Sequence, residues 1–423
     1  MPYKIRLIDE TIQQYLKSFP AFLLIGAKGV GKTRSCQEFA KTSFELDNRS
    51  VREGLELLPT HLNTASAPIL LDEWQFSPEL WNYVRHAVDD GLKEGTIIFT
   101  GSSPKIDMPI HSGAGRIPIL KMRPFSLEER QLTTKKASLS QMFELVNNFK
   151  CEEKIDVQAE QYLDEIFRSG FPGIRDKKEM ARDIQLEDYI QNMLTHDFVE
   201  QGYPIRKPQS VLAWWRTYAG AIATVTSFQT ILTTAMATNV EAPSKGTANS
   251  YRDALEAFNM IEEVPAWLPM GKLMANIART PKHFLVDPAF AIKLLGISKE
   301  QLINYQPPKS LGKINVSFIG RLFESLVYQS LSVYSDLNRA QLSHFRTNTG
   351  KEIDFIVQKG NILLLFEVKS ATTINQEDTK HLNWFETQVR DEYQVVKNLI
   401  YSGQVAYKRS DGINVIPAAM LAK

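Results

Sequence analysis

The stretch that decides the fold runs from Ala21 to Thr33 and reads Ala21-Phe22-Leu23-Leu24-Ile25-Gly26-Ala27-Lys28-Gly29-Val30-Gly31-Lys32-Thr33. A short apolar run ends at Gly26, and a glycine-rich turn then leads into residues that favour a helix. From Gly26 the spacing is G-x-x-x-x-G-K-T, which is the pattern of a phosphate-binding P-loop. The order strand, turn, helix is the one that this motif requires, so we prefer this interpretation to a chance glycine-rich turn.

The residue types in this turn suit a bound anion. Gly26, Gly29 and Gly31 allow a positive φ and let backbone N–H groups approach phosphate oxygens closely. The helix that follows adds free N–H groups and the positive end of its dipole. Lys32 is predicted to reach the β- and γ-phosphates, and the Thr33 hydroxyl to hold Mg²⁺. The expected ligands are therefore ATP and Mg²⁺.

A second stretch, Ala67 to Glu73, predicts the partner of the P-loop. It is an unbroken apolar run that ends in two carboxylates, which is typical of a buried parallel strand with acids at its carboxyl end. Ligands of open α/β sheets bind at that edge. In this Walker B pattern Asp72 is expected to bind Mg²⁺, directly or through water, and Glu73 to polarise the attacking water as a general base. An ordinary exit from a strand is the alternative.

A third strand is predicted at Thr96 to Ser103, and it ends in hydroxyl groups. In P-loop proteins with an additional strand, a polar group at this point contacts the γ-phosphate or orients water. Thr100 and Ser102 are the candidates for that role, and a hydroxyl-rich turn without chemistry is the alternative.

Five stretches together resemble one family, and they occur in the same order along the chain. They are GAKGVGKT at 26–33, LDEWQ at 71–75, TGSS at 100–103, AGR at 114–116 and RPFSLEE at 123–129. This series resembles a large group of bacterial and archaeal AAA-type ATPases whose C-terminal region is classified only as a domain of unknown function. The resemblance implies that Arg116 is an arginine finger or sensor; a solvated arginine is the alternative. Gly113 departs from the family, which often has leucine before this Ala-Gly-Arg.

Composition agrees with an ordinary soluble protein of several domains. The 423 residues exceed the usual size of one core, and the net charge of +1 excludes a global attraction to nucleic acid or membrane. No apolar run approaches the length of a membrane span, and the cysteines, Cys36 and Cys151, lack metal or redox spacing. We expect Cys36 to be a core residue, and the protein to be cytoplasmic, with reduced cysteines and no membrane contact.

The middle of the chain predicts two helical regions. Residues 131–208 have a helical, polar pattern and are expected to form a lid. Residues 209–278 contain three helical blocks and then a strand-like exit, which suggests a winged-helix-like module. Its third helix offers side chains able to contact duplex DNA, namely Lys245, Asn249, Ser250, Tyr251 and Arg252. The same helix carries Asp253 and Glu256, so packing against a protein is the other interpretation.

The last third of the chain predicts a hairpin with charged residues on one face. Residues 352–357 and 362–369 flank a turn, and pairing of Gln358 with Asn361 would place Asp354 opposite Leu365. Glu367 and Lys369 then share that face, because side chains alternate along a strand.

This D…E-x-K arrangement, with Glu324 on the preceding helix, resembles the restriction-endonuclease-like superfamily. Asp354 and Glu367 could hold Mg²⁺ while Lys369 positions or activates water. The alternative is a fold retained without cleavage, with its charges on a solvated face.

The predicted architecture is thus α/β, in four parts. They are an AAA-type P-loop ATPase domain at 1–130, a helical lid at 131–208, a winged-helix-like module at 209–278 and a restriction-endonuclease-like domain at 279–423. Mg²⁺-dependent ATP hydrolysis is the expected activity, with Lys32, Glu73 and Arg116 as catalytic residues. Two functions remain open: an ATP-driven enzyme that acts with or on DNA, and a nucleotide-gated switch or assembly protein whose C-terminal domain only binds a partner. Self-association into a homo-oligomer is compatible with both.

Overall fold

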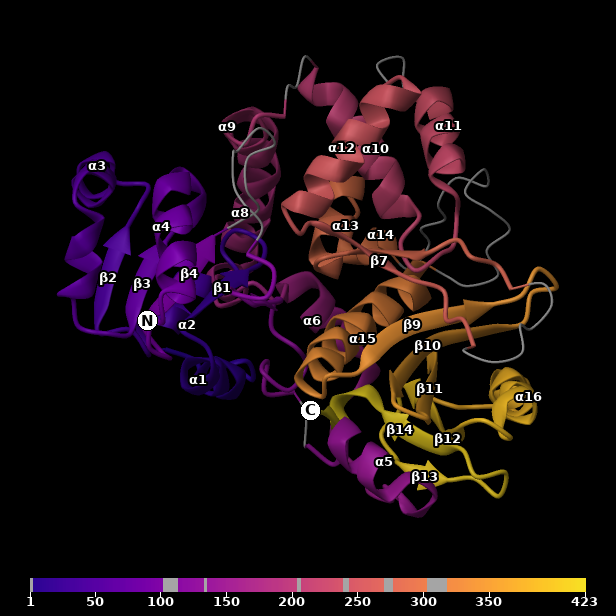
Figure 1. Cartoon of the computed structure of the whole chain (residues 1–423). Coiled ribbons are helices and arrows are strands. Elements are labelled where there is room, and N and C mark those ends of the chain that lie inside the picture. The colour runs from indigo at the N-terminus through magenta and orange to yellow at the C-terminus, as the bar shows by residue number, and fades with distance from the viewer. Residues whose placement is uncertain are drawn as a thin grey trace.

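The computed structural model describes residues 3–101, 113–132, 135–203, 207–238, 243–269, 277–302 and 318–423. Ser102 and Ser103, named above as part of the third strand, lie outside the described residues. The chain begins with a parallel sheet, continues through a helical region and ends in a second sheet (Figure 1). Within the described ranges, no helix combines the length and the apolar character needed to cross a membrane.

The N-terminal sheet has five parallel strands in the order β2-β3-β4-β1-β5. The strands are β1 (Ala21–Ile25), β2 (Thr42–Glu45), β3 (Ile69–Asp72), β4 (Ile97–Gly101) and β5 (Ile119–Lys121). Both β1 and β3 are continuous apolar runs because both faces of the sheet are covered. This order confirms the predicted parallel α/β sheet and places β4 between the strand before the P-loop and the strand that ends in Asp72.

Helices cover the two faces of this sheet. They are α1 (Asp9–Ser18), α2 (Lys32–Gln37), α3 (Arg49–Leu57) and α4 (Pro78–Asp89). Alternate residues of β1 enter different cores: Leu23 packs with Leu55 of α3 and Trp81 of α4, whereas Phe22 belongs to a core that continues through the rest of the chain. Cys36 is fully buried in the second of these cores, as predicted.

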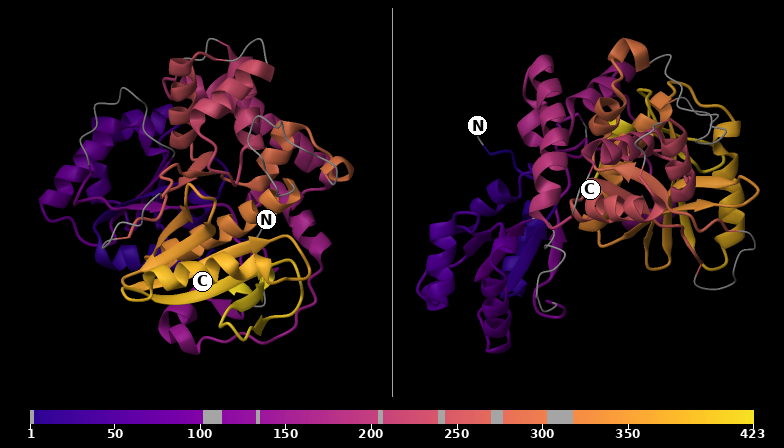
Figure 2. Two further views of the ribbon diagram at one scale, coloured as in Figure 1. Left: turned by 90° about the vertical axis from the view of Figure 1, so that its right-hand side faces the viewer. Right: turned by 90° about the horizontal axis from the view of Figure 1, so that it is seen from above.

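The helical region follows the first sheet. Its helices are α6 (Ala159–Arg168), α7 (Pro172–Arg175), α8 (Glu179–Asn192), a π-helical turn (Met193–Asp197), α9 (Phe198–Glu200), α10 (Pro208–Gly220), α11 (Phe228–Thr238), α12 (Lys245–Ala257), α13 (Pro288–Leu295) and α14 (Lys299–Leu302). The three predicted helical blocks correspond to α10, α11 and α12, and the strand-like exit corresponds to β7 (Ile261–Val264), which pairs with β8 (Lys282–Leu285) in antiparallel fashion. We call residues 179–200 the arm; seen from above, α8 lies between the first sheet and the rest of the molecule (Figure 2).

The C-terminal sheet has six strands in the order β13-β14-β12-β11-β10-β9. They are β9 (Gln341–Arg346), β10 (Glu352–Lys359), β11 (Ile362–Lys369), β12 (Gln394–Tyr401), β13 (Tyr407–Lys408) and β14 (Asn414–Pro417). The sheet is mixed: β9, β10 and β11 are antiparallel neighbours, and β11, β12 and β14 are parallel. Helix α15 (Phe318–Leu337) packs on one face and α16 (Lys380–Val389) on the other.

The predicted register of the β10–β11 hairpin is wrong by two residues. Lys359 pairs with Ile362 across a two-residue turn, and Phe355 pairs with Phe366. The turn has the predicted length of two residues but lies one residue further along the chain, where Gly360 adopts a positive φ of 59°. Asp354 therefore lies beside Glu367 rather than opposite Leu365. A shift by two residues keeps every side chain on its face, so Asp354 and Glu367 still point the same way.

Residues 137–157, which we assigned to the lid, pack against the C-terminal sheet. Strand β6 (Ala137–Ser138) pairs with β15 (Leu421–Ala422), and the backbone N–H of Ile155 donates to the carbonyl of Gln404. Helix α5 (Leu139–Leu145) lies beside β13 in Figure 1. Sequence periodicity identified the helix but not its partner. The other predicted domain limits stay predictions.

A buried arginine just after the first sheet contacts α6, α15 and the residue that caps α13. Arg130 donates to the carbonyl oxygen and the carboxylate of Glu165 on α6 and to the side chain of Gln329 on α15. Its guanidinium lies 3.6 Å from Asp287, the residue that caps α13, and neither side chain is exposed. Asp287 also accepts from the backbone N–H of Gly170 at 2.6 Å.

Replacing Arg130 with alanine is predicted to destabilise the whole chain. The change leaves the buried Asp287 carboxylate without its cation, whereas Glu165 keeps Arg175 and Arg168. The loss should lower the free energy of unfolding by about 3–5 kcal/mol. Urea unfolding followed by circular dichroism measures this. Arg49→Ala, which removes an exposed ion pair with Glu53, is the matched control and should leave the midpoint nearly unchanged. Equal midpoints for the two variants would show that the buried network adds nothing to stability.

Candidate functional site

The glycine-rich turn has the backbone that the motif requires. Gly26 has a φ of 154°, and a Cβ at this position would lie 2.3 Å from the carbonyl oxygen of Met122. Gly31 has a φ of 107° and precedes the first residue of α2. A side chain at either position would strain the turn or collide with the segment that follows β5. The turn is therefore fixed between the end of β1 and the start of α2.

Lys32 is buried and folds back on the turn. Its ammonium donates to the carbonyl oxygens of Gly26 at 3.0 Å and Ala27 at 3.1 Å. Burial lowers the pKa of Lys32, while the nearby carboxylates of Glu73 and Asp72 oppose that effect. The side chain is thus held at the turn by contacts that a phosphate group could replace.

Three oxygen-bearing side chains meet at the carboxyl edge of the sheet. The hydroxyl of Thr33 donates to Asp72 Oδ1 at 3.0 Å, and the hydroxyl of Thr100 donates to the same oxygen. They converge because α2 begins and β3 and β4 end at this edge. Thr100 was predicted to contact the γ-phosphate or to orient water; here its fully buried hydroxyl supports Asp72 instead.

Glu73 lies directly after this strand in a left-handed conformation, with φ 56° and ψ 50°. The turn directs its carboxylate to the side of Gln75, whose amide donates to Glu73 Oε2 at 2.5 Å. Burial raises the pKa of Glu73, and this hydrogen bond and the charge of Lys32 partly offset the rise. A half-buried carboxylate of raised pKa beside the P-loop suits a general base.

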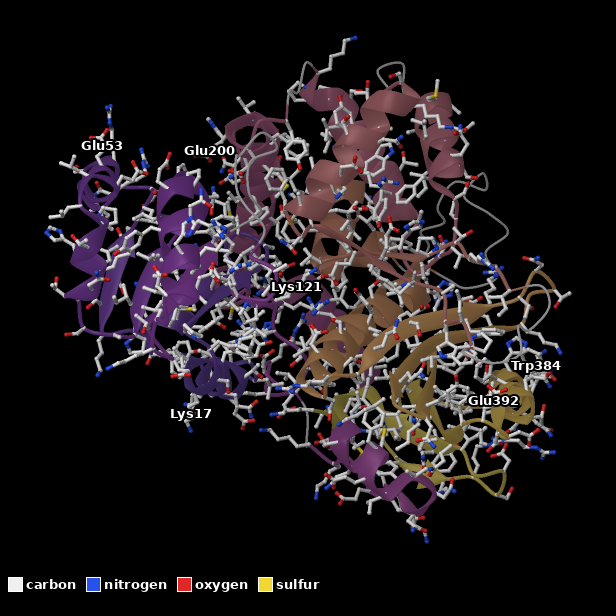
Figure 3. All side chains as sticks on the ribbon, viewed as in Figure 1. Lys17, Glu53, Lys121, Glu200, Trp384 and Glu392 are labelled. Carbon is white, nitrogen blue, oxygen red and sulfur yellow. The ribbon has the colours of Figure 1, made fainter. Side chains whose placement is uncertain are left out.

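A cavity of about 210 Å³ lies between the P-loop and the arm. The residues that line it are Lys28, Lys32, Asp47, Glu73, Gln75, Phe76, Met193, Asp197, Glu200, Gln201 and Phe258. Glu200, labelled in Figure 3, belongs to α9 of the arm. Two contacts join the arm to the P-loop: Lys28 Nζ lies 2.9 Å from Asp197 Oδ1, and the Tyr189 hydroxyl donates to the Lys28 carbonyl oxygen at 2.9 Å.

Sequence reasoning missed Arg6, which hydrogen-bonds to the backbone of the P-loop. Its buried guanidinium donates to the carbonyl oxygens of Val30 at 3.1 Å and Arg123 at 2.7 Å, and it lies 4.4 Å from the centre of the Phe125 ring. Glu129 pairs with Arg6 at 2.8 Å. Three residues that contact Arg6 lie in the RPFSLEE stretch at 123–129, which was already noted for its resemblance to the family. That stretch was the one sequence signal for this part of the site, because nothing in the sequence around Arg6 marked it.

The structure does not bring Arg116 to the P-loop of its own chain. Arg116 Nε lies 2.6 Å from Asp89 Oδ1 at the end of α4, and its side chain is 39% exposed. Because β5 begins just afterwards at Ile119, Arg116 lies toward the edge where the strands start. Lys32 and Asp72 lie at the opposite edge, where β1 and β3 end.

The predicted DNA-contacting residues of α12 divide into two sets. Lys245, Asn249 and Ser250 are exposed. Tyr251 is buried and cannot contact DNA, so its prediction is wrong. Arg252 pairs with Asp253 at 2.9 Å and lies over the Phe228 ring, which leaves it half-buried.

The predicted metal residues of the C-terminal sheet lie together, but a lysine that sequence reasoning missed lies among them. Lys282 Nζ is 2.5 Å from Glu324 Oε1, 2.9 Å from Asp354 Oδ1 and 3.3 Å from Glu352 Oε1. Burial lowers the pKa of Lys282, but the carboxylates outweigh it and hold that pKa well above its usual value. No sequence motif marked Lys282, because it lies on β8, which is not part of the C-terminal sheet and is distant in sequence from Asp354 and Glu367.

Glu367 and Lys369 complete this group. Lys369 Nζ donates to Glu367 Oε1 at 2.7 Å, and the Val368 N–H donates to Asp354 Oδ2 at 2.9 Å. Burial and then the charge of Asp354 raise the pKa of Glu367 to about 8. Asp354 and Glu367 are buried, so the interpretation as a solvated face is wrong.

Comparison with known families places the first sheet. Residues 18–131 match the model of the AAA domain, residues 159–301 a domain of unknown function (DUF8612), and residues 319–421 another domain of unknown function (DUF4143). The parallel sheet and the P-loop geometry define the first of these segments as a P-loop ATPase domain. The match of this segment to an AAA domain supports ATP binding and hydrolysis.

Among solved structures, the chain is similar to a Walker-type ATPase of Pyrococcus abyssi. The TM-score is 0.40 and the identity 14%, over 69% of this chain and 96% of that chain. A TM-score this low does not establish a common arrangement, so the assignment rests on the AAA match and on the site. No curated protein matches the chain.

Proposed function

We propose that the chain is a Mg²⁺-dependent ATPase that binds ATP between the P-loop and the arm and uses its hydrolysis to control how the C-terminal part binds a partner. The observation that carries this proposal is the meeting of Thr33, Thr100 and Asp72 beside Lys32 and Glu73. Hydroxyl and carboxylate oxygens are the ligands that Mg²⁺ prefers, so these side chains fit the ion. When bound, Mg²⁺ supplies positive charge to the phosphate oxygens.

Each residue of the site then has a role in turnover. Lys32 exchanges its two carbonyl partners for phosphate oxygens, and the N–H groups of the P-loop bind the same phosphates. Thr33 and Asp72 hold the ion, and Thr100 fixes Asp72. Glu73 accepts a proton from the attacking water, and Gln75 orients its carboxylate.

The arm provides the coupling to nucleotide. Lys28 belongs to the P-loop but pairs with Asp197 of the arm at 2.9 Å. A triphosphate at the P-loop attracts the same ammonium, so nucleotide and Asp197 compete for Lys28. Binding should therefore weaken the contact between the arm and the P-loop, and product release should restore it.

The later parts of the chain support a binding module. The order α15-β9-β10-β11-α16-β12, with Asp354, Glu367 and Lys369 on one face, supports a restriction-endonuclease-like fold. The helices α10 to α12 with the β7–β8 pair support a winged-helix-like module. Because Lys282 takes the position among the carboxylates, we favour a module that binds a partner over one that cleaves DNA.

Duplex DNA is the second candidate partner. Lys245, Asn249 and Ser250 are exposed near the start of α12 and could reach a phosphate backbone or base edges. Asp253 and Glu256 are exposed on the same helix and oppose such contact.

Glu73→Gln is predicted to retain ATP binding and lose turnover, because the amide cannot accept the proton of the attacking water. The turnover rate should fall by roughly 10²–10⁴-fold. Lys32→Ala should instead weaken ATP binding, since the cation that meets the phosphates is lost. Calorimetric binding and phosphate release separate the two effects. Glu53→Gln, the same change on the exposed face of α3, is the control (Figure 3). Unchanged hydrolysis by Glu73→Gln would disprove its role as the base.

Arg116 is predicted to act on the ATP site of a second copy of this chain, because it lies at the opposite edge of the sheet from its own P-loop. Arg116→Ala should reduce hydrolysis per chain on the order of 10³-fold. Mixing it with Lys32→Ala protein should restore part of the activity, since each copy supplies what the other lacks. Arg49→Ala serves as the control for loss of an exposed arginine. A rate per chain that does not depend on concentration, with no rescue on mixing, would contradict action in trans.

Binding to duplex DNA, if it occurs through α12, is predicted to be salt-dependent. Lys245→Ala should weaken it about equally for all sequences and reduce the slope against log salt by about one. Lys293→Ala, which removes a half-buried lysine of α13 that pairs with exposed Asp183 and Glu187, is the control. Fluorescence anisotropy with a labelled duplex measures both. No binding at low salt, or equal loss in both variants, would rule out α12 as a DNA-binding helix and favour the protein partner.

A further inference from the structure

The carboxylate cluster of the C-terminal sheet is completed by an ammonium group from another part of the fold. Lys282 belongs to β8, which pairs with β7 and not with the six-stranded sheet. Its side chain is 1% exposed, and its Nζ lies within 3.3 Å of oxygens from Glu324, Glu352 and Asp354. The ammonium donates a hydrogen bond to Asp354 Oδ1, and the Glu324 and Glu352 carboxylates are ion-pair partners at short distance.

Further oxygens of the cluster are engaged as well. Asp354 uses Oδ1 for Lys282 and Oδ2 for the Val368 N–H, and Glu367 uses Oε1 for Lys369. Glu367 Oε2 is buried and has no hydrogen-bond partner within the part of the chain that the structure describes. A divalent ion such as Mg²⁺ needs several oxygens at about 2.1 Å around one point, and here an ammonium already lies where oxygens of Glu324, Glu352 and Asp354 converge. Among the described residues, no group of three or more acidic, His or Cys side chains is arranged to hold a metal ion.

The packing around β8 keeps Lys282 in this position. The backbone of Lys282 pairs with Val264 of β7, and its ammonium lies 5.4 Å from the centre of the Phe355 ring. The next residues are fixed as well: His283 packs edge-on against Phe228, and Phe284 stacks on Tyr328. Withdrawal of the lysine would leave the carboxylates buried together without a cation, which is strongly unfavourable.

We infer that the Lys282 ammonium takes the place of the divalent cation in this nuclease-like site, so that the C-terminal domain binds no catalytic metal and cleaves no phosphodiester. The predicted metal role of Asp354 and Glu367 is replaced by a structural one. The lysine instead joins the β7–β8 pair to α15 and β10. This inference concerns a site separate from the P-loop and holds whether or not ATP is hydrolysed.

The test is a titration of Mn²⁺ into the full chain, followed by calorimetry and by electron paramagnetic resonance of free Mn²⁺. All proteins carry Asp72→Asn and contain no nucleotide, so that the P-loop site contributes little. The protein that retains Lys282 should bind no Mn²⁺ at Asp354, so Asp354→Asn should not change its Mn²⁺ uptake. Lys282→Met keeps the length of the side chain and removes its charge. This variant should bind one Mn²⁺ at least roughly tenfold more tightly than the protein that retains Lys282. Adding Asp354→Asn to that variant should abolish the gain.

The controls separate this effect from loss of any lysine. Lys293→Met removes a lysine that also pairs with two carboxylates, on the surface, and should gain no site. The inference would be overturned if the protein that retains Lys282 bound one Mn²⁺ and Asp354→Asn abolished that binding. Plasmid nicking that Asp354→Asn abolished would also overturn it. A folded Lys282→Met protein without any gain would also overturn it. If Lys282→Met does not fold, the test is Mn²⁺ uptake by the protein that retains Lys282, with and without Asp354→Asn. Equal uptake supports the inference, and loss of a Mn²⁺ site in Asp354→Asn refutes it.

Discussion

The burial of one guanidinium group, that of Arg130, couples the positions of the first sheet, α6, α13 and α15. A cation removed from water must be neutralised and fully hydrogen-bonded, and here its partners come from separate parts of the fold. Glu165 lies on α6, Asp287 caps α13, and Gln329 lies on α15. A Cβ on Gly170 would lie 2.7 Å from this guanidinium, so the turn before α7 must be glycine to pass it. The positions of these elements are therefore coupled through a single charge, and none can shift alone without exposing an unpaired group.

Contacts continue from the P-loop to the C-terminal sheet without a break. Arg6 donates to carbonyl oxygens of both Val30, in the P-loop, and Arg123, beyond β5. Arg123 lies near Glu262 of β7, and Glu262 accepts from the Tyr328 hydroxyl on α15. Figure 3 shows the neighbouring cation, Lys121, where the first sheet meets the rest of the molecule. Contiguous packed and hydrogen-bonded residues of this kind are a physical route by which a nucleotide-dependent change could reach the C-terminal part.

Patterns that depend on neighbouring residues were predictable from the sequence, and contacts that depend on folding were not. The P-loop and the strand that ends in Asp72 were found because their chemistry needs fixed spacing. Asp354 and Glu367 were placed on one face because side-chain alternation survives a register error of two residues. By contrast, Arg6 and Lys282 reach their sites from elements distant in sequence, and their local surroundings give no sign of it. The pairing of β6 with β15 was missed for the same reason: it joins residues 137–138 to residues 421–422, which are distant in the sequence.

The two carboxylate groups of this protein show what separates a metal site from an ion pair. Asp72 has hydroxyl neighbours, which donate weakly and can turn their lone pairs toward a cation, and the nearby lysine is bound to backbone carbonyls instead. Asp354 has an ammonium at hydrogen-bonding distance, fixed by a strand that cannot withdraw. Asp72 ends β3 and Asp354 lies near the start of β10, but both are buried strand residues, so burial does not distinguish them. The two sites differ in the element that carries the lysine. At the P-loop the lysine comes from the same loop that binds the phosphates and can exchange its partners when a phosphate arrives. In the C-terminal sheet it comes from a separate packed strand, so its charge is a permanent part of the fold.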